Sequence, residues 1–102
     1  MDDVDLSDHR VLVVSHDAGG AEIVSSWVKK KGGPHFKFLL EGPAIKVFKE
    51  KIEGLVNLDR HCLEASAIRR FDFVLTGSGY ISDLEKKAVR AARVAGIPTV
   101  TY

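Results

Sequence analysis

The sequence predicts a three-layer α/β domain in which a doubly wound parallel sheet lies between two layers of helices. Two observations carry this prediction. Short apolar segments rich in β-branched residues alternate with longer segments whose apolar residues recur at helical spacing, and this alternation is typical of consecutive βαβ units. The chain has 102 residues, of which 45% are hydrophobic and 28% charged, as expected for one globular domain.

Five segments have the composition of strands, and the first is a continuous apolar run, as expected for a strand buried on both faces. They are Val11–Val14, Phe36–Leu40, Leu55–Leu58, Phe71–Leu75 and Ile97–Tyr102. Because right-handed crossovers connect parallel strands, we expect the strand order 3-2-1-4-5. The first and fourth strands are neighbours in that order, so the switch point of the sheet lies between them.

Four helices are expected between the strands. The first covers Ala18–Lys31 and ends at two glycines and a proline. The second starts at Pro43 and ends near Gly54, with apolar residues at i, i+3 and i+7. The third covers Cys62–Arg70. The fourth begins with a capping box at residues 82–85 and carries alanines along one face.

Charge and composition exclude several classes of protein. Lys plus Arg number 15 and Asp plus Glu 14, and this net charge of +1 argues against a protein whose main role is to bind nucleic acid. The single cysteine allows no internal disulfide and no multi-cysteine zinc site, which fits a reducing cytoplasm. No apolar stretch approaches the ~20 residues that span a bilayer. We expect a cytoplasmic protein that binds a small molecule.

Glycine-rich loops follow the two strands at the predicted switch point, at residues 15–21 and 76–80. Ligands of open α/β sheets bind beyond the carboxyl ends of the strands at such a point. Each loop also leads into a helix N-terminus, whose free amides and positive dipole favour an anion. A sugar or phosphate group is therefore expected to bind Gly19, Gly20, Gly77, Ser78 and Gly79.

His16 and Asp17 in the first loop are the candidate catalytic residues. His16 could act as a general acid or base or bind a sugar hydroxyl or phosphate; the alternative is a loop histidine bonded to the backbone. Asp17 could orient His16 or hold a ligand hydroxyl, but the pattern favours a cap on the following helix. In the second loop, Ser78 and Tyr80 could donate to a ligand oxygen. Neither the Gly-x-Gly-x-x-Gly spacing nor a P-loop is present, so these loops do not identify the ligand.

Two further groups of polar residues follow the second and third predicted strands. Glu41 comes about 20 residues after Gly20, where an acid commonly binds a ribose in nicotinamide-dependent enzymes; the alternative is a solvated carboxylate. Asp59, His61 and Cys62 could indicate a metal ligand or a nucleophile. Further ligands or an identified base are missing, so the favoured interpretation is that Asp59 caps the third helix and Cys62 packs in the core. No metal site is expected.

Three segments resemble the amino-terminal domain of nucleotide-sugar enzymes: VLVVSHDAGGA at 11–21, EGPA at 41–44 and FDFVLTGSG at 71–79. They are similar to the two-domain, GT-B-like group that includes glycosyltransferases and hydrolysing sugar-nucleotide epimerases, in particular those of bacterial surface-polysaccharide biosynthesis. The resemblance implies a Rossmann-like domain whose glycine loops face a cleft. It also implies that a carboxyl-terminal half, which residues 1–102 lack, holds most of the nucleotide.

The resemblance implies that this single domain is the amino-terminal part of a longer enzyme and is inactive alone. It places His16, Asp17, Gly19 and Gly20 in the cleft from the first loop and 77–79 from the fourth, with His16 the best candidate for a catalytic base. It implies no resident cofactor. Two alternatives stay open. One is a nicotinamide-dinucleotide-binding module, and the other is a non-catalytic interaction or regulatory domain whose last strand pairs with a partner.

Overall fold

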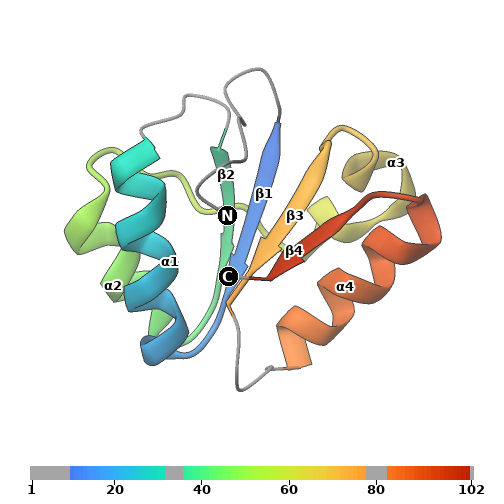
Figure 1. Cartoon of the computed structure of the whole chain (residues 1–102). Coiled ribbons are helices and arrows are strands. Elements are labelled where there is room, and N and C mark those ends of the chain that lie inside the picture. Colours follow the sequence, from blue (N-terminus) through green and yellow to red (C-terminus); the bar gives the residue numbers. More distant parts are fainter. Residues whose placement is uncertain (1–9, 32–35, 78–82, 102) are drawn as a thin grey trace.

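The computed structural model describes residues 10–31, 36–77 and 83–101, and within them four parallel strands form one sheet (Figure 1). The strands are β1 (Val11–Ser15), β2 (Phe36–Leu40), β3 (Phe73–Thr76) and β4 (Thr99–Thr101). Their order is β2-β1-β3-β4, so the chain moves outward from β1 first on one side and then on the other. The parallel α/β architecture predicted from the sequence is confirmed.

Helices cover both faces of the sheet, α1 (Ala18–Lys31) and α2 (Ala44–Lys51) on one side, and α3 (Ala65–Ile68) and α4 (Asp83–Ala95) on the other (Figure 1). A short 3-10 helix, η1 (Arg60–Leu63), precedes α3. Side chains of β1 alternate between the two layers, because successive residues of a strand point to opposite faces. Val11 and Val13 pack with the α1 and α2 layer, whereas Leu12 and Val14 pack with the α3 and α4 layer.

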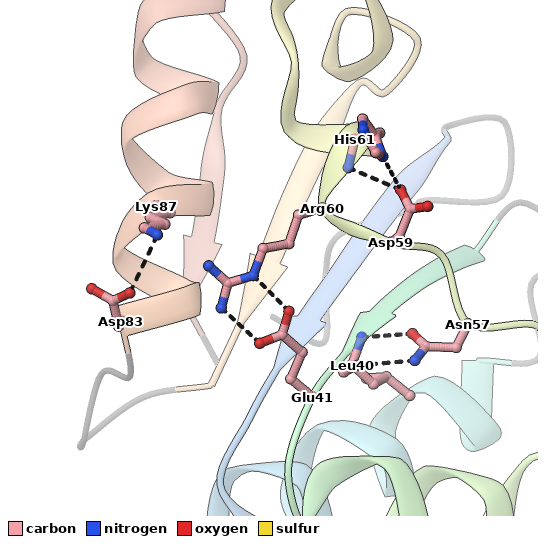
Figure 2. Close-up of polar contacts among 8 residues, drawn as sticks. All are labelled: Leu40, Glu41, Asn57, Asp59, Arg60, His61, Asp83 and Lys87. Atoms are coloured by element: carbon pink, nitrogen blue, oxygen red, sulfur yellow. Dashed lines mark hydrogen bonds and ion pairs between the residues drawn. The ribbon is translucent and has the colours of Figure 1, made fainter.

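The third predicted strand is wrong: the described residues hold four strands, and the segment Leu55–Leu58 makes a single bridge to β2, between Asn57 and Phe38. The reason is the side chain of Asn57. Its Oδ1 accepts a hydrogen bond from the Leu40 N–H at 2.7 Å, and its Nδ2 donates to the Leu40 carbonyl at 2.9 Å (Figure 2). The Leu58 N–H also donates to the Phe38 carbonyl at 2.8 Å, so one backbone hydrogen bond and one carboxamide join this segment to β2 where a strand ladder was predicted. The other four strands lie in the relative order that was expected.

The third predicted helix is also interrupted. Glu64 has extended backbone angles, φ −66° and ψ 149°, and separates η1 from α3. The first predicted helix has the expected bounds, and Pro43 precedes the second as its N-cap rather than as its first residue. Of the predicted capping box, Ser82 lies outside the described residues and Glu85 is buried in α4. None of the described helices is long and apolar enough to cross a lipid bilayer.

Candidate functional site

The loops after β1 and β3 meet at the carboxyl edge of the sheet. A Cβ atom added to Gly77 would lie 3.4 Å from the Cα atom of Gly20 and 3.8 Å from its carbonyl oxygen. The two backbones are therefore in contact with no side chain between them. The predicted ligand residues Ser78 and Gly79, and also Tyr80, lie outside the described residues. Within the described part, the structure brings together Gly19, Gly20 and Gly77 at the switch point.

Asp17 is the N-cap of α1, as the pattern favoured. Its Oδ2 accepts a hydrogen bond from the Gly20 N–H at 3.0 Å, and its carbonyl accepts one from the Ala21 N–H at 3.1 Å. The side chain thus satisfies one free amide of the first turn. Its negative charge lies at the positive end of the helix, so a phosphate bound there would have to share that end with a carboxylate.

His16 lies between the loops that follow β1 and β2. Its carbonyl accepts a hydrogen bond from the Ala44 N–H at 3.0 Å, so its backbone joins the two loops. Its half-buried imidazole lies directly over Gly42, where an added Cβ would come within 2.9 Å of Nε2. Gly42 has φ +59°, a left-handed conformation that favours glycine. The imidazole makes no hydrogen bond with any residue in 10–31, 36–77 or 83–101.

Glu41 forms a two-pronged ion pair with Arg60, a residue that the sequence interpretation missed (Figure 2). Arg60 Nε donates to Glu41 Oε2 and Arg60 Nη2 donates to Oε1, both at 2.7 Å. The hydrogen bond from Arg60 is the main cause that lowers the pKa of Glu41, against a smaller opposing effect of burial. The residues are 19 positions apart, so no local spacing could have revealed the pair. A ribose at Glu41 would have to share a carboxylate whose two oxygens already bind Arg60.

The polar residues after the third predicted strand do not form a catalytic or metal centre. Asp59 caps η1 by accepting from the His61 N–H at 2.9 Å, and both side chains are exposed (Figure 2). Burial, together with the charge of Asp59, raises the pKa of the Cys62 thiol to about 11. Cys62 is therefore protonated at neutral pH and is a poor nucleophile. No cluster of three or more potential metal ligands occurs among the described side chains.

Carboxylates accompany both helices that start at this edge of the sheet. Asp17 caps α1, and the first turn of α4 contains the exposed Asp83, whereas Glu85 in the same turn is buried. The cations on the same side are Arg60, held by Glu41, and Lys87, whose Nζ lies 3.5 Å from Asp83 Oδ2. The edge therefore offers carboxylate acceptors beside its amides, a combination that suits hydroxyl groups better than an isolated phosphate.

Comparisons with known proteins assign no family to this geometry. No protein-family model matches the chain, and a search of curated proteins finds no match. The likeness to nucleotide-sugar enzymes rests on the three sequence segments at 11–21, 41–44 and 71–79.

Proposed function

We propose that this chain is the amino-terminal, Rossmann-like domain of an enzyme that handles nucleotide sugars, and that the carboxyl edge of its sheet binds the sugar. The contact between Gly77 and Gly20 carries the proposal, because it joins the loops after β1 and β3 at the switch point. Open α/β sheets bind their ligands at this position. Glycines carry no side chain, so a ligand at this edge would meet the main chain of the two loops directly.

The charges at this edge favour sugar hydroxyls over phosphate as the group that touches the loops. Asp17 and Asp83 are acceptors for hydroxyl donors, and they repel a phosphate that approaches either helix start. The phosphates of the ligand would then lie toward Arg60 and Lys87, or in a second domain. This arrangement agrees with the division of labour that the resemblance implies, in which another half of the enzyme holds the nucleotide.

His16 is the residue best placed for acid or base chemistry. Its ring lies over Gly42 and makes no hydrogen bond within the described structure, so its nitrogens would be available for acid or base chemistry. A neutral imidazole can accept a proton from a sugar hydroxyl, and an imidazolium can return one to a leaving oxygen. Asp17 Oδ2 is already bound to the amide of Gly20 and holds the first turn of α1, so Oδ1 is the oxygen that would accept from a ligand hydroxyl.

The nicotinamide alternative receives no support from the arrangement of Glu41. Both oxygens of its carboxylate are bound by Arg60, whereas the expected role requires acceptors for the two ribose hydroxyls. The sugar-binding proposal needs no change in this ion pair.

The test is a titration of ¹⁵N-labelled protein with a uridine diphosphate sugar, with uridine diphosphate alone and with the free sugar. The nucleotide sugar is expected to shift the amide signals of Gly19, Gly20 and Gly77. Asp17→Asn keeps the helix cap and removes the charge, so it should weaken these shifts. Asp59→Asn, the same change at the cap of η1, is the matched control and should not. Shifts confined to β4, or no shift at millimolar ligand, would refute the proposal.

A further inference from the structure

A second concave surface lies between α4 and the segment that contains η1 and α3. It is a groove of about 440 Å³ that starts near Arg60 and extends along α4 as far as Ala95. Its lining is predominantly apolar, and the residues that provide it are Leu63, Ala65, Ala91, Val94 and Ala95. Val94 is 78% exposed, a high value for a large aliphatic side chain. Arg60 and Lys87 lie where this groove meets the sugar site proposed above, whereas its apolar lining has no part in that site.

Cationic side chains surround the apolar lining. Four of them border the groove, Arg60, Arg69, Lys87 and Arg90, against the single carboxylate of Glu64. Arg60 and Lys87 are paired with Glu41 and Asp83. Arg69 and Arg90 form no ion pair with any described residue, so their charges are available to a binding partner. An occupant of the groove should therefore be apolar on one side and acidic at its flanks.

The walls of the groove decide the backbone conformation of the occupant. The α4 wall is a continuous helix whose main-chain groups are mostly used within the helix, and the facing wall consists of two four-residue helical segments separated by the extended Glu64, so neither wall is the edge of a strand. An extended peptide would find no row of free donors and acceptors to pair with, whereas a helix satisfies its own backbone and needs only side-chain contacts. Three of the five apolar lining residues are alanines, which allow a second helix to approach α4 closely, at the short end of the usual 8–10 Å separation.

We propose that this groove is a docking site for an amphipathic α-helix of a partner protein, with an apolar stripe against Ala91 and Val94 and acidic residues opposite Arg69 and Arg90. On α4, Lys87, Ala91, Val94 and Ala95 follow one another at i, i+4, i+7 and i+8, so they form one continuous stripe along the helix. A partner helix along this stripe would pack its apolar side chains on Ala91 and Val94. Its acidic flanks would face Arg69 and Arg90.

A synthetic helical peptide of about 15 residues, long enough to be partly helical alone, tests the proposal. It carries leucines at i, i+4 and i+7 and glutamates on both flanks; a second peptide has lysine at every glutamate. In an NMR titration of the whole chain, the acidic peptide should shift residues 60–69 and 87–95, and the lysine peptide should not. Equal binding of both peptides, or shifts on α1 and α2, would overturn the proposal.

Charge reversal supplies the matched variants. Arg69→Glu with Arg90→Glu should weaken the acidic peptide by about tenfold or more. Lys46→Glu with Lys49→Glu changes the net charge by the same amount on the exposed side of α2, on the other face of the sheet, and should leave affinity unchanged. Equal losses in both double variants would show only long-range attraction and refute the site. Val94→Ser, at an exposed position, should also weaken binding.

Sedimentation of the unliganded protein tests the other possible occupant of the groove, a second copy of this chain. If the chain self-associates and the same groove residues shift with protein concentration, the occupant is a second copy of the chain and the proposed partner helix is wrong. A monomer that binds the acidic peptide at the groove supports the proposal.

Discussion

Gly20 and Gly77 touch across the carboxyl edge of the sheet, with 3.4 Å between the Cα atom of Gly20 and the place where a Cβ atom of residue 77 would stand. Gly77 is buried at this point. The start of α1 lies close to the end of β3 here, so a side chain at residue 77 that extends beyond its Cβ atom would push the two loops apart.

Gly77→Val is expected to destabilise the protein by about 1–3 kcal/mol, the usual cost of overpacking, because its γ-methyl groups would meet the backbone of Gly20. Gly77→Ala is the matched control, since its Cβ would make an ordinary van der Waals contact. Urea unfolding of both variants measures the difference. A valine variant as stable as the alanine variant would mean that the loops separate freely.

A second close contact joins Gly42 to His16. Gly42→Ala should cost about 1–2 kcal/mol for a left-handed residue and a further amount for the clash of its Cβ with the imidazole. In a His16→Ala background only the first cost remains. The double variant should therefore be more stable than the sum of the single effects predicts, as measured by a thermodynamic cycle of urea unfolding.

Gly54→Ala provides the control for this cycle. Gly54 has φ +73°, and an added Cβ would have no atom within 4 Å. Its substitution should show the conformational cost alone, and it should combine additively with His16→Ala. Additive behaviour at Gly42 as well would contradict the steric role of the histidine ring.

The Glu41–Arg60 pair should make stability depend on pH in the acid range. The pKa of Glu41 is lower in the folded protein than in the unfolded chain, mainly because of the Arg60 hydrogen bond. The pair therefore stabilises the fold above the pKa of the unfolded glutamate, and this stabilisation is lost as the pH falls through the folded-state pKa. Solvent screening keeps the effect small.

Arg60→Gln should raise the pKa of Glu41 towards its ordinary value, which a carbon-detected NMR titration of the carboxyl group measures directly. Arg69→Gln removes an arginine that has no ion pair with a described residue, and it should leave this titration unchanged. If the two variants behave alike, general charge rather than the pair lowers the pKa.

The carboxamide of Asn57 should be needed for the order of Leu40. In Asn57→Asp an oxygen replaces the Nδ2 donor and faces the Leu40 carbonyl, so we expect a loss of about 1–2 kcal/mol. Hydrogen exchange of the Leu40 amide should become faster, since its acceptor is no longer held in place. Glu53→Gln, an exchange of acid and amide at an exposed neighbouring residue, should alter neither quantity.

The sequence predicted the features that depend on local pattern. The buried run of β1, the bounds of α1 and the meeting of the loops after β1 and β3 all follow from periodicity, glycines and the right-handed crossover rule. The prediction failed where one side chain acted at a distance. The Asn57 side chain pairs with the Leu40 main chain where a third strand was predicted. Nothing in the composition of 55–58 distinguishes such a segment from a short strand.

The contacts of the candidate site also include some that the sequence could predict and some that it could not. The capping role of Asp17 could be predicted, because an N-cap depends only on neighbouring residues. The pairing of Glu41 with Arg60 could not, because it depends on how the loop after β2 lies against η1. The same holds for the position of His16 over Gly42, since it joins two loops that are separated by a whole helix.

The Asn57 carboxamide at the end of β2 also has a consequence for association between molecules. Without Asn57, the peptide group of Leu40 would offer a free donor and acceptor at the end of β2, and unpaired main-chain groups at the edge of a sheet can pair with extended chains of other molecules. We therefore expect Asn57 to oppose edge-to-edge association of the sheet in a concentrated solution.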